Sequence, residues 1–414
     1  MKWFNKKILF LFASSSILWQ VTFVGCEFYI LRIIDPDLIG IWQMVLLVQS
    51  YTAISRLGII NAMNREFPFY LGEENNKKAT EVHTTTFSFV LMNGFVLSLF
   101  FMFLMFYFSS NGLNWQIAFG SMAIIIFLEF IANYLEATLR GIKKFSQISK
   151  YQLCLIPIAL LTLLFPLEYN FIGLCIRAIL ISFLKLLILL ILTFEYLSMP
   201  KFQMLVLKNL FNLGWRLWIW NYLKNLIKSF PRLIIVTFSG SGLLGLYAPV
   251  NWINMAFTSL SGSISAYIYP NLSHNLAKKD SNIGQQALYI TKYTLIIFLP
   301  MTILGIFLLP YIIPWLLPKY IVAISAMQVS LVAGLFESIN LATTAFATLK
   351  AWKVMFTHIF ISIALKGILI LNFYFMFDNK LLGVATGICI ASILMFGITW
   401  RMVSLLDKPS NANI

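Results

Sequence analysis

The stretch LGWRLWIWNYLKNLIKSFPRLIIVTF, residues 213–238, is long and apolar enough to cross a bilayer as a helix, yet three cations interrupt it. Lys224, Lys228 and Arg232 follow one another at four-residue spacing. On a helix each such step turns the side chain by about 40°, so the three cations share an arc of about 80° with Asn221. Each charge costs about 2.5 to 3.5 kcal/mol near the centre of a spanning helix. We therefore predict that this face lines a polar interior and binds an anion.

Aromatic residues in the same stretch leave a second interpretation open. They are of the kind that gathers at the membrane–water interface, namely Trp215, Trp218, Trp220 and Tyr222. In this interpretation residues 205–228 form an amphipathic helix on the inner surface, with Lys224 and Lys228 extended towards water. A span over residues 230–250 would then be required, which breaks the even number of spans described below. We favour the spanning helix.

Composition places the whole chain in the membrane. Of its 414 residues 60% are hydrophobic and only 11% are charged, and the mean hydropathy is +0.85. Twelve segments have about the length and apolar character of a spanning helix. They are residues 8–31, 39–63, 84–109, 115–139, 151–167, 171–194, 213–238, 243–268, 289–312, 321–348, 354–376 and 381–404. We predict an all-α integral membrane protein with about 12 transmembrane helices.

The net charge of +15 is distributed as expected for membrane topology rather than for nucleic-acid binding. Most Lys and Arg residues lie in the terminal segments and in every second loop, whereas the other loops hold only Arg32, Lys319 and Lys380. Because cytoplasmic loops are enriched in Lys and Arg, this pattern places both termini in the cytoplasm. No partner nucleic acid is expected.

Three landmarks recur in the same order in both halves of the chain, at shifts of 201 to 210 residues. The first pairs Leu38-Ile39-Gly40-Ile41-Trp42 with Leu243-Leu244-Gly245-Leu246-Tyr247; the second pairs Phe67-Pro68 and Lys77-Lys78 with Tyr269-Pro270 and Lys278-Lys279; the third pairs Ala137-Thr138-Leu139-Arg140 with Ala347-Thr348-Leu349-Lys350. Six spans per half keep the same orientation. We predict two six-helix lobes, residues 1–205 and 206–414, related by a pseudo-two-fold axis along the membrane normal.

Carboxylates inside the predicted spans are the next candidates. Glu129 and Glu136 lie seven residues apart on one helical face, and Glu337 follows Glu129 by 208 residues, close to the repeat shift. These three residues are our candidates for binding a coupling proton or sodium ion. Two alternatives stay open, because they could instead neutralise the basic residues of the seventh span or pair structurally with cations such as Arg56 and Lys366.

Other motifs carry little chemistry in this context. Residues 240–245 satisfy the Gly-x-Gly-x-x-Gly fingerprint but lie in a turn between two predicted helices, with no strand before them. His83, His274 and His358 make no recognised metal spacing. Short outer loops leave no room for an extracytoplasmic catalytic domain. We predict no catalytic residues, no metal and no cofactor, and a transporter rather than an enzyme.

Several motifs of this sequence are similar to those of a known family. They are the Gly-aromatic landmark after the first span, Leu57-Gly58 with Arg65 and Pro68, the run Arg232-Leu233-Ile234-Ile235, and Leu244-Gly245-Leu246-Tyr247 leading to Pro270. Together they are similar to the polysaccharide flippases of the multidrug, oligosaccharidyl-lipid and polysaccharide exporter superfamily, with bacterial O-antigen flippases as the most similar type. Two positions depart from the family pattern, because Pro231 and Arg56 stand where relatives often have acidic residues.

The resemblance implies a flippase that moves an undecaprenyl-pyrophosphate-linked oligosaccharide, an O-antigen or related lipopolysaccharide repeat unit, across the bacterial plasma (cell inner) membrane by alternating access. A cationic cavity would hold this lipid-linked oligosaccharide, and Lys224, Lys228, Arg232, Asn221 and Arg56 are the candidates for it. Membrane lipids and other polysaccharide assembly proteins are the expected partners, and a proton, sodium or the membrane potential would drive the movement. The alternatives are a multidrug cation exporter of the same superfamily and a membrane-embedded glycosyltransferase or polymerase.

Overall fold

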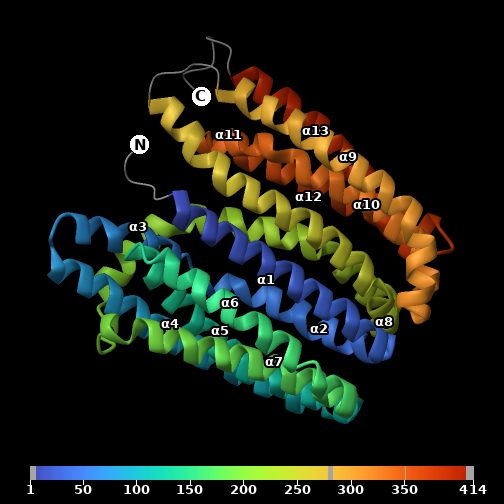
Figure 1. Ribbon diagram of the computed structural model, residues 1–414, viewed down its shortest axis with the longest axis horizontal. Helices are drawn as coiled ribbons and strands as arrows, with labels where there is room; N and C mark the ends of the chain where they lie inside the picture. The colour runs from blue at the N-terminus through green and yellow to red at the C-terminus, as the bar shows by residue number, and fades with distance from the viewer. Residues whose placement is uncertain (1–5, 278–282, 350, 407–414) are drawn as a thin grey trace. The chain divides into compact units, whose positions relative to one another are not determined.

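A computed structural model of the chain describes residues 6–277, 283–349 and 351–406, without the side chains of residues 6–10, 12–13, 217, 259–277, 347 and 406. All regular elements in these ranges are helical, which confirms the all-α prediction (Figure 1). Some landmark residues fall outside this description: Lys278-Lys279 and Lys350 entirely, and Tyr269-Pro270, His274 and Ala347 in their side chains.

The first half of the chain forms seven α-helices over the six predicted spans. They are α1 Lys6–Ile33, α2 Pro36–Thr52, α3 Ile59–Gly72, α4 Asn76–Tyr107, α5 Leu113–Gly141, α6 Phe145–Leu161 and α7 Leu164–Thr193. The predicted span 39–63 is broken between α2 and α3, where the 3₁₀ turn Ala53–Arg56 leads into Leu57 and Gly58 at φ of 47° and 73°. Two successive left-handed residues end a right-handed helix. Arg56 is thereby placed at a break in the helix.

Helix α8, Met204–Ala277, runs through 74 residues but changes direction at Gly240. Gly240 has φ 79° and ψ −169°, a conformation that is open essentially to glycine alone. The predicted spans 213–238 and 243–268 lie on the two sides of this residue. One glycine therefore replaces the loop that the sequence predicts between them.

The rest of the chain forms α9 Ile283–Leu316, α10 Ile324–Ile339, α11 Thr343–Thr348, α12 Trp352–Met376 and α13 Lys380–Leu406. In the described ranges ten segments are long and apolar enough to cross a membrane. One of them, Trp218–Thr258, contains the turn at Gly240 and includes parts of two predicted spans, and the 17-residue α6 is shorter than the spanning length used for the ten. These features account for the difference between ten and the predicted twelve. The chain is a multi-pass membrane protein.

Packing divides the chain into two compact units, which we describe separately. The N-terminal unit comprises Met1–Ile34 and Ile41–Leu226, and the C-terminal unit comprises Asp35–Gly40 and Ile227–Ile414. The division falls inside α8. The predicted lobe boundary at residues 205/206 concerns the sequence repeat rather than packing, and it stays a prediction.

Two landmark glycines contact each other's backbone within the C-terminal unit. A Cβ atom added to Gly245 would lie 1.7 Å from the carbonyl oxygen of Pro36, and one added to Gly40 would lie 1.9 Å from that of Ser241. Neither site tolerates a side chain without a backbone shift. The start of α2 and the part of α8 after Gly240 are therefore held at a separation that only glycine permits.

Helix α9 carries three prolines in its interior, and one of them is compensated by a neighbouring helix. Pro310 has no N–H, so the carbonyl oxygen of Ile306 loses its partner within the helix. Gln328 Nε2 on α10 donates a hydrogen bond to that oxygen at 3.0 Å. Because water is scarce in a bilayer, a side chain that satisfies a freed carbonyl is what allows proline in a spanning helix.

Candidate functional site

The three predicted cations of the seventh span lie on α8 before Gly240, within the segment Trp218–Thr258 that is apolar enough to cross a membrane. Lys224 belongs to the N-terminal unit, and its ammonium lies 4.5 Å from the centroid of the Trp220 ring, in cation–π contact. Lys228 and Arg232 belong to the C-terminal unit. Asn221 is exposed, one turn before Lys224. The cations thus have different surroundings although they share one helix.

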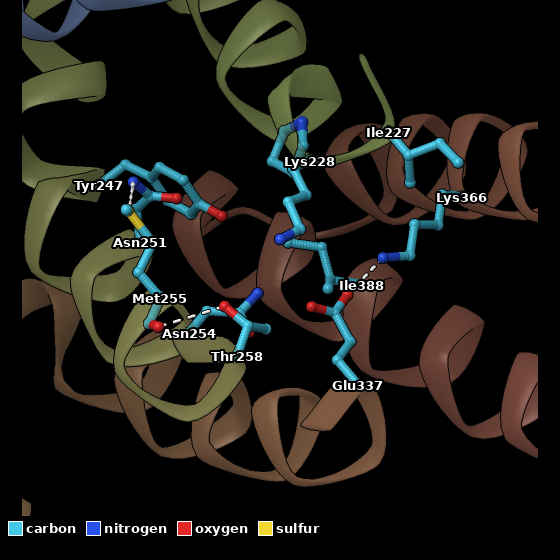
Figure 2. Close-up of a pocket in the computed structure, with 11 residues that line it drawn as sticks. Ile227, Lys228, Tyr247, Asn251, Asn254, Met255, Thr258, Glu337, Lys366 and Ile388 are labelled. Carbon is cyan, nitrogen blue, oxygen red and sulfur yellow. Dashed lines mark hydrogen bonds and ion pairs between the residues drawn. The ribbon is translucent and has the colours of Figure 1, made fainter. Parts of the chain in front are cut away.

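A cavity of about 40 Å³ lies in the C-terminal unit, and Lys228 lines it (Figure 2). By this measure it holds about three water molecules or an oxyanion of similar size, since one water needs about 10–15 Å³. Three helices supply its polar wall: Lys228, Tyr247, Asn251 and Asn254 come from the two arms of α8, Glu337 from α10 and Lys366 from α12. A fourth helix, α13, contributes the apolar Ile388.

Glu337 is the centre of the charge in this cavity. Its carboxylate accepts a very short hydrogen bond from the Lys366 ammonium and a second, of 3.2 Å, from Ser392 Oγ. Asn254 lines the same cavity, and Lys228 is near enough to attract the carboxylate electrostatically. The Glu337 and Lys366 side chains are only 14% and 11% exposed. Two ammonium groups around one carboxylate leave the cavity with one positive charge in excess.

Arg232 lies close to the same cavity. Its charge acts on Tyr247, a buried residue of the cavity wall. Two of the three predicted cations are therefore at or beside the cavity, while Lys224 packs on Trp220. The structure also brings Lys228 and Glu337 together, although the sequence predicts them as separate candidates for substrate binding and ion coupling.

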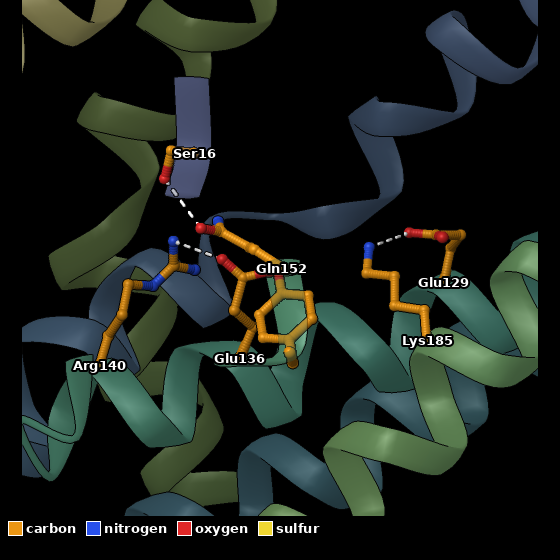
Figure 3. Close-up of polar contacts among 7 residues, drawn as sticks. Ser16, Glu129, Glu136, Arg140, Gln152 and Lys185 are labelled. Atoms are coloured by element: carbon orange, nitrogen blue, oxygen red, sulfur yellow. Dashed lines mark hydrogen bonds and ion pairs between the residues drawn. The ribbon is translucent and has the colours of Figure 1, made fainter. Parts of the chain in front are cut away.

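The N-terminal unit contains a second carboxylate with two cations near it. Glu129 on α5 accepts a hydrogen bond from Lys185 Nζ on α7 at 2.9 Å (Figure 3). It accepts a second, of 3.3 Å, from Ser182 Oγ on the same helix. Arg56 acts on Glu129 electrostatically, and its guanidinium carbon lies 5.4 Å from the centroid of the Phe130 ring. This group matches the one around Glu337: each has one carboxylate, one serine, one bonded lysine and one further cation.

Two other glutamates within the predicted spans of the N-terminal unit are also paired. Glu136 accepts a hydrogen bond of 2.8 Å from the Tyr151 hydroxyl, and the Arg140 guanidinium lies 3.3 Å from it (Figure 3). Glu27 accepts a hydrogen bond of 2.9 Å from Arg177, whose side chain is 3% exposed.

Each intraspan glutamate in the described ranges therefore has a cationic partner. Of the alternatives left open by the sequence, this arrangement favours structural pairing and charge neutralisation. Ion coupling at Glu129, Glu136 and Glu337 stays a prediction.

Sequence reasoning missed the serines and the partner of Glu129. Lys185 is visible as a cation within the sixth span, but its pairing depends on how two helices face each other. Ser182 and Ser392 lie 210 residues apart, the same shift as the third landmark. That shift is a signal that could have identified them.

Two buried histidines have hydroxyl partners rather than metal-site neighbours. His83 Nε2 lies 2.8 Å from the Tyr134 hydroxyl and 3.1 Å from Thr138 Oγ1. His358 Nε2 lies 2.7 Å from Thr399 Oγ1. Within the described ranges no three His, Cys, Asp or Glu residues are grouped so that they could hold a metal ion.

Residues 30–326 match the family described as polysaccharide biosynthesis protein. The chain belongs to this family. No curated protein matches the sequence.

Solved structures show the fold of this polysaccharide biosynthesis protein. A multidrug resistance MATE family transporter of the MOP superfamily, in an inward-facing conformation, has a TM-score of 0.78 at 12% identity, covering 94% of this chain and 96% of the other. A eukaryotic MATE transporter gives 0.66 at 12% identity, with 97% and 98% covered. A mutant MATE transporter of Vibrio cholerae gives 0.65 at 11% identity, with 96% of each chain covered.

The family and the fold together confirm the resemblance predicted from the sequence. The protein belongs to a polysaccharide biosynthesis family and has the fold of the MATE transporters. At these identities the structural likeness concerns the fold, and the compounds handled by the MATE transporters do not transfer to this chain.

Proposed function

We propose that this polysaccharide biosynthesis protein is a flippase that moves an undecaprenyl-pyrophosphate-linked oligosaccharide, such as an O-antigen or related lipopolysaccharide unit, across the bacterial inner membrane. The observation that carries the proposal is the excess positive charge beside Glu337, inside a unit built from apolar spanning helices. The family description, polysaccharide biosynthesis, supplies the process that needs such a step.

A cationic site addresses the main physical obstacle to this movement. A pyrophosphate head group loses its hydration in hydrocarbon, which costs many kcal/mol for each unpaired charge. Lys228 and Arg232 would replace part of that hydration, and Lys224, Asn221 and Arg56 are the further candidates for binding the head group. The lipid tail would stay in the bilayer while the head group moves by alternating access.

The energy source that we favour is the membrane potential. With both termini in the cytoplasm, an anionic head group moves outward down an inside-negative potential, which contributes about 2.3 kcal/mol per charge per 100 mV. No nucleotide or other cofactor is then needed. Coupling to a proton or sodium ion at Glu129, Glu136 or Glu337 is the alternative. Membrane lipids and other polysaccharide assembly proteins are the proposed partners.

The pairing of the intraspan carboxylates argues against the rival function of a multidrug cation exporter. An organic cation needs a carboxylate that is free to receive it, whereas Glu27, Glu129, Glu136 and Glu337 each have an Arg or Lys within 3.3 Å. A cation would have to displace a tethered cation of the protein. An anion at Lys228 meets only Glu337, a carboxylate that is already bonded to Lys366.

The test is a flipping assay with purified full-length protein in liposomes that contain a fluorescent lipid-linked oligosaccharide. We expect the double variant Lys228→Ala/Arg232→Ala to reduce the flipping rate by about tenfold or more, since each lost charge contact weakens binding by about a factor of ten. Lys292→Ala, the same change at an exposed residue of α9, is the matched control.

Four outcomes decide between the functions. Slower flipping in the double variant, with normal thermal stability and an unaffected control, supports the proposal. Wild-type flipping in the double variant overturns the cationic site. Transport of ethidium without transport of the lipid-linked oligosaccharide would favour the multidrug exporter, and sugar transfer between lipid carriers would favour a glycosyltransferase or polymerase.

A further inference from the structure

One contact is repeated almost identically in the two units. Glu129 accepts a hydrogen bond from Ser182 at 3.3 Å in the N-terminal unit, and Glu337 accepts one from Ser392 at 3.2 Å in the C-terminal unit. The glutamates are 208 residues apart and the serines 210. Both shifts agree with the landmark shift at the end of the fourth span. The Glu–Ser contact is therefore a duplicated feature.

The charges around this contact repeat as well. In each unit a lysine hydrogen-bonds the glutamate: Lys185 bonds Glu129, and Lys366 bonds Glu337. In each unit a second cation acts on the same glutamate electrostatically, Arg56 in one and Lys228 in the other. Arg56 and Lys228 are both exposed, and neither side chain has a hydrogen bond or ion pair with another residue in the described ranges.

Duplication alone does not explain the repeated charge set, because the cations come from positions that are not equivalent. At a shift of 210 the counterpart of Lys366 is Ile156 on α6, whereas Lys185 is on α7. At a shift of 205 the counterpart of Lys228 is Phe23 on α1, whereas Arg56 follows α2. The two units thus surround a shared Glu–Ser contact with the same charges by different routes.

The charge balance defines what each cluster can bind. The bonded lysine neutralises the glutamate, so the second cation leaves one positive charge in excess. At Lys228 this charge borders a cavity of about 40 Å³, which fits a small oxyanion but not a sugar ring. A ligand with one negative charge brings the cluster to neutrality, and neutrality is favoured in surroundings of low dielectric constant.

We propose that each cluster is a subsite for one singly charged oxyanion, a phosphoryl or a carboxyl group, and that Glu129 and Glu337 are the resident counter-ions of Arg56 and Lys228 when the subsite is empty. The inference rests on the proposed function only in assigning the oxyanion to the transported head group. The serines and the bonded lysines are positioning residues, because they hold the glutamates in place.

The counter-ion has a physical purpose in a transporter. A cation in an apolar protein interior without a counter-charge attracts an anion strongly and releases it slowly. A carboxylate beside the cation weakens this attraction and is available to the cation when the ligand leaves. Charges within about 4–6 Å of each other change each other's equilibria by about ten- to a thousandfold, which is the range in which the counter-ion sets the affinity.

The proposal is tested by titrating full-length protein in detergent with dimethyl phosphate, a singly charged phosphodiester, and separately with glucuronate, a singly charged carboxylate. Calorimetry measures one subsite at a time, in a variant that lacks the cation of the other subsite. The Arg56→Gln variant isolates the subsite at Glu337, and the Lys228→Gln variant isolates the subsite at Glu129. In the Arg56→Gln background we expect Glu337→Gln to tighten binding by about tenfold and Lys228→Gln to weaken it by about tenfold. Glu129→Gln should tighten binding in the Lys228→Gln background.

A purely structural glutamate predicts the opposite result. Its loss would lower thermal stability and would weaken binding or leave it unchanged, so tighter binding after Glu337→Gln is the distinguishing outcome. The double variant Glu337→Gln/Lys366→Gln keeps the cluster at one positive charge, and its affinity should stay within about threefold of that of its background. The single variant Glu337→Gln leaves Lys366 buried without its carboxylate and could misfold for that reason. The double variant has no such unpaired lysine, so it tests the charge balance in a protein that folds.

The outcomes separate this inference from the proposed function. Equal or weaker binding in both glutamine variants of the glutamates overturns the counter-ion role, even if the protein flips lipid-linked oligosaccharide. The expected affinity changes in a protein that flips no such lipid would sustain the subsites and overturn the flippase. Preference for dimethyl phosphate assigns the subsites to a phosphoryl group, and preference for glucuronate assigns them to an acidic sugar.

Discussion

The two units handle charge inside spanning helices in different ways. In the N-terminal unit three glutamates face three bonded cations, in the pairs Glu27–Arg177, Glu129–Lys185 and Glu136–Arg140, and the further cations Arg56 and Lys224 lie in the same unit. In the C-terminal unit Glu337 is the one intraspan glutamate of the described ranges, and Lys228 and Lys366 both act on it, with Arg232 near the same cavity. The first unit pairs three of its intraspan cations with three glutamates, whereas in the second unit three cations lie at or beside one glutamate.

One pair of equivalent positions makes the contrast concrete. Glu27 lies on α1, and the residue 205 positions later is Arg232 on α8. Arg177, the partner of Glu27, corresponds at a shift of 210 to Gly387, where a Cβ would lie 2.7 Å from the Ile370 Cα atom and so has no room. A neutral pair in one unit thus corresponds to a single cation in the other. The difference teaches that the repeat preserves helices more strictly than charge.

The strongest test of this contrast is to break one of the neutral pairs of the N-terminal unit. Arg177→Met leaves the Glu27 carboxylate, 12% exposed, without its cation, and we expect a loss of about 3–5 kcal/mol in the free energy of unfolding. The measurement is denaturant unfolding of the purified protein in detergent. The double variant Glu27→Leu/Arg177→Met removes both charges and should recover most of the loss. A double variant as unstable as the single one would contradict the pairing.

The two lysine–glutamate pairs allow a finer comparison. Lys366→Met should cost about 2–4 kcal/mol, because Glu337 is left 14% exposed in a protein interior. Lys185→Met should cost about 1–2 kcal/mol, because Glu129 is 26% exposed and water screens it better. Thermal unfolding of both variants checks the order. An equal loss at both sites would mean that burial does not determine the strength of these pairs.

The buried histidines of the two units have different hydroxyl partners. Tyr134→Phe removes the 2.8 Å contact to His83 in the N-terminal unit and leaves Thr138 Oγ1, so we expect a loss of about 1–2 kcal/mol. Thr399→Val removes a contact to His358 in the C-terminal unit and should cost a similar amount. Unfolding midpoints measure both, and an unchanged midpoint for Tyr134→Phe would show that the hydroxyl is not needed.

The smallest effect is expected where a pair is exposed. Lys319 bonds Asp35 in the C-terminal unit, but the two side chains are 40% and 61% exposed. Lys319→Gln should change stability by less than about 0.5 kcal/mol, and raised salt should erase the difference. A large effect at low salt that persists at high salt would show that this contact is more than a surface ion pair.

Hydropathy was sufficient to predict the helices, but not how their charges pair. Each predicted span is mostly helical in the described ranges, because a bilayer forces apolar segments of this length into helices. The pairing of Glu129 with Lys185 depends on the rotation and depth of α5 against α7, which a single sequence does not contain. The Glu–Ser contact could have been predicted from the sequence, since its glutamates are 208 residues apart and its serines 210, close to the landmark shift.

The sequence predicted the position of the turn near Gly240 but not its length. Gly240 looks like part of a loop in the sequence, because Ser239-Gly240-Ser241-Gly242 is a typical turn composition. In the structure one glycine in a left-handed conformation suffices, and helix resumes at once. Composition predicts where a chain turns, while the length of the turn depends on the packing on both sides.

The hydrogen bond from Gln328 to the Ile306 carbonyl implies a thermodynamic link between residues 310 and 328. With proline at 310, the side-chain amide at 328 satisfies the Ile306 carbonyl oxygen. With a residue that has its own N–H at 310, that N–H would take the carbonyl oxygen, and the amide at 328 would lose its acceptor. Among relatives that keep α9 and α10 in this register, the two positions should therefore change together, and each should look neutral only in the presence of the other.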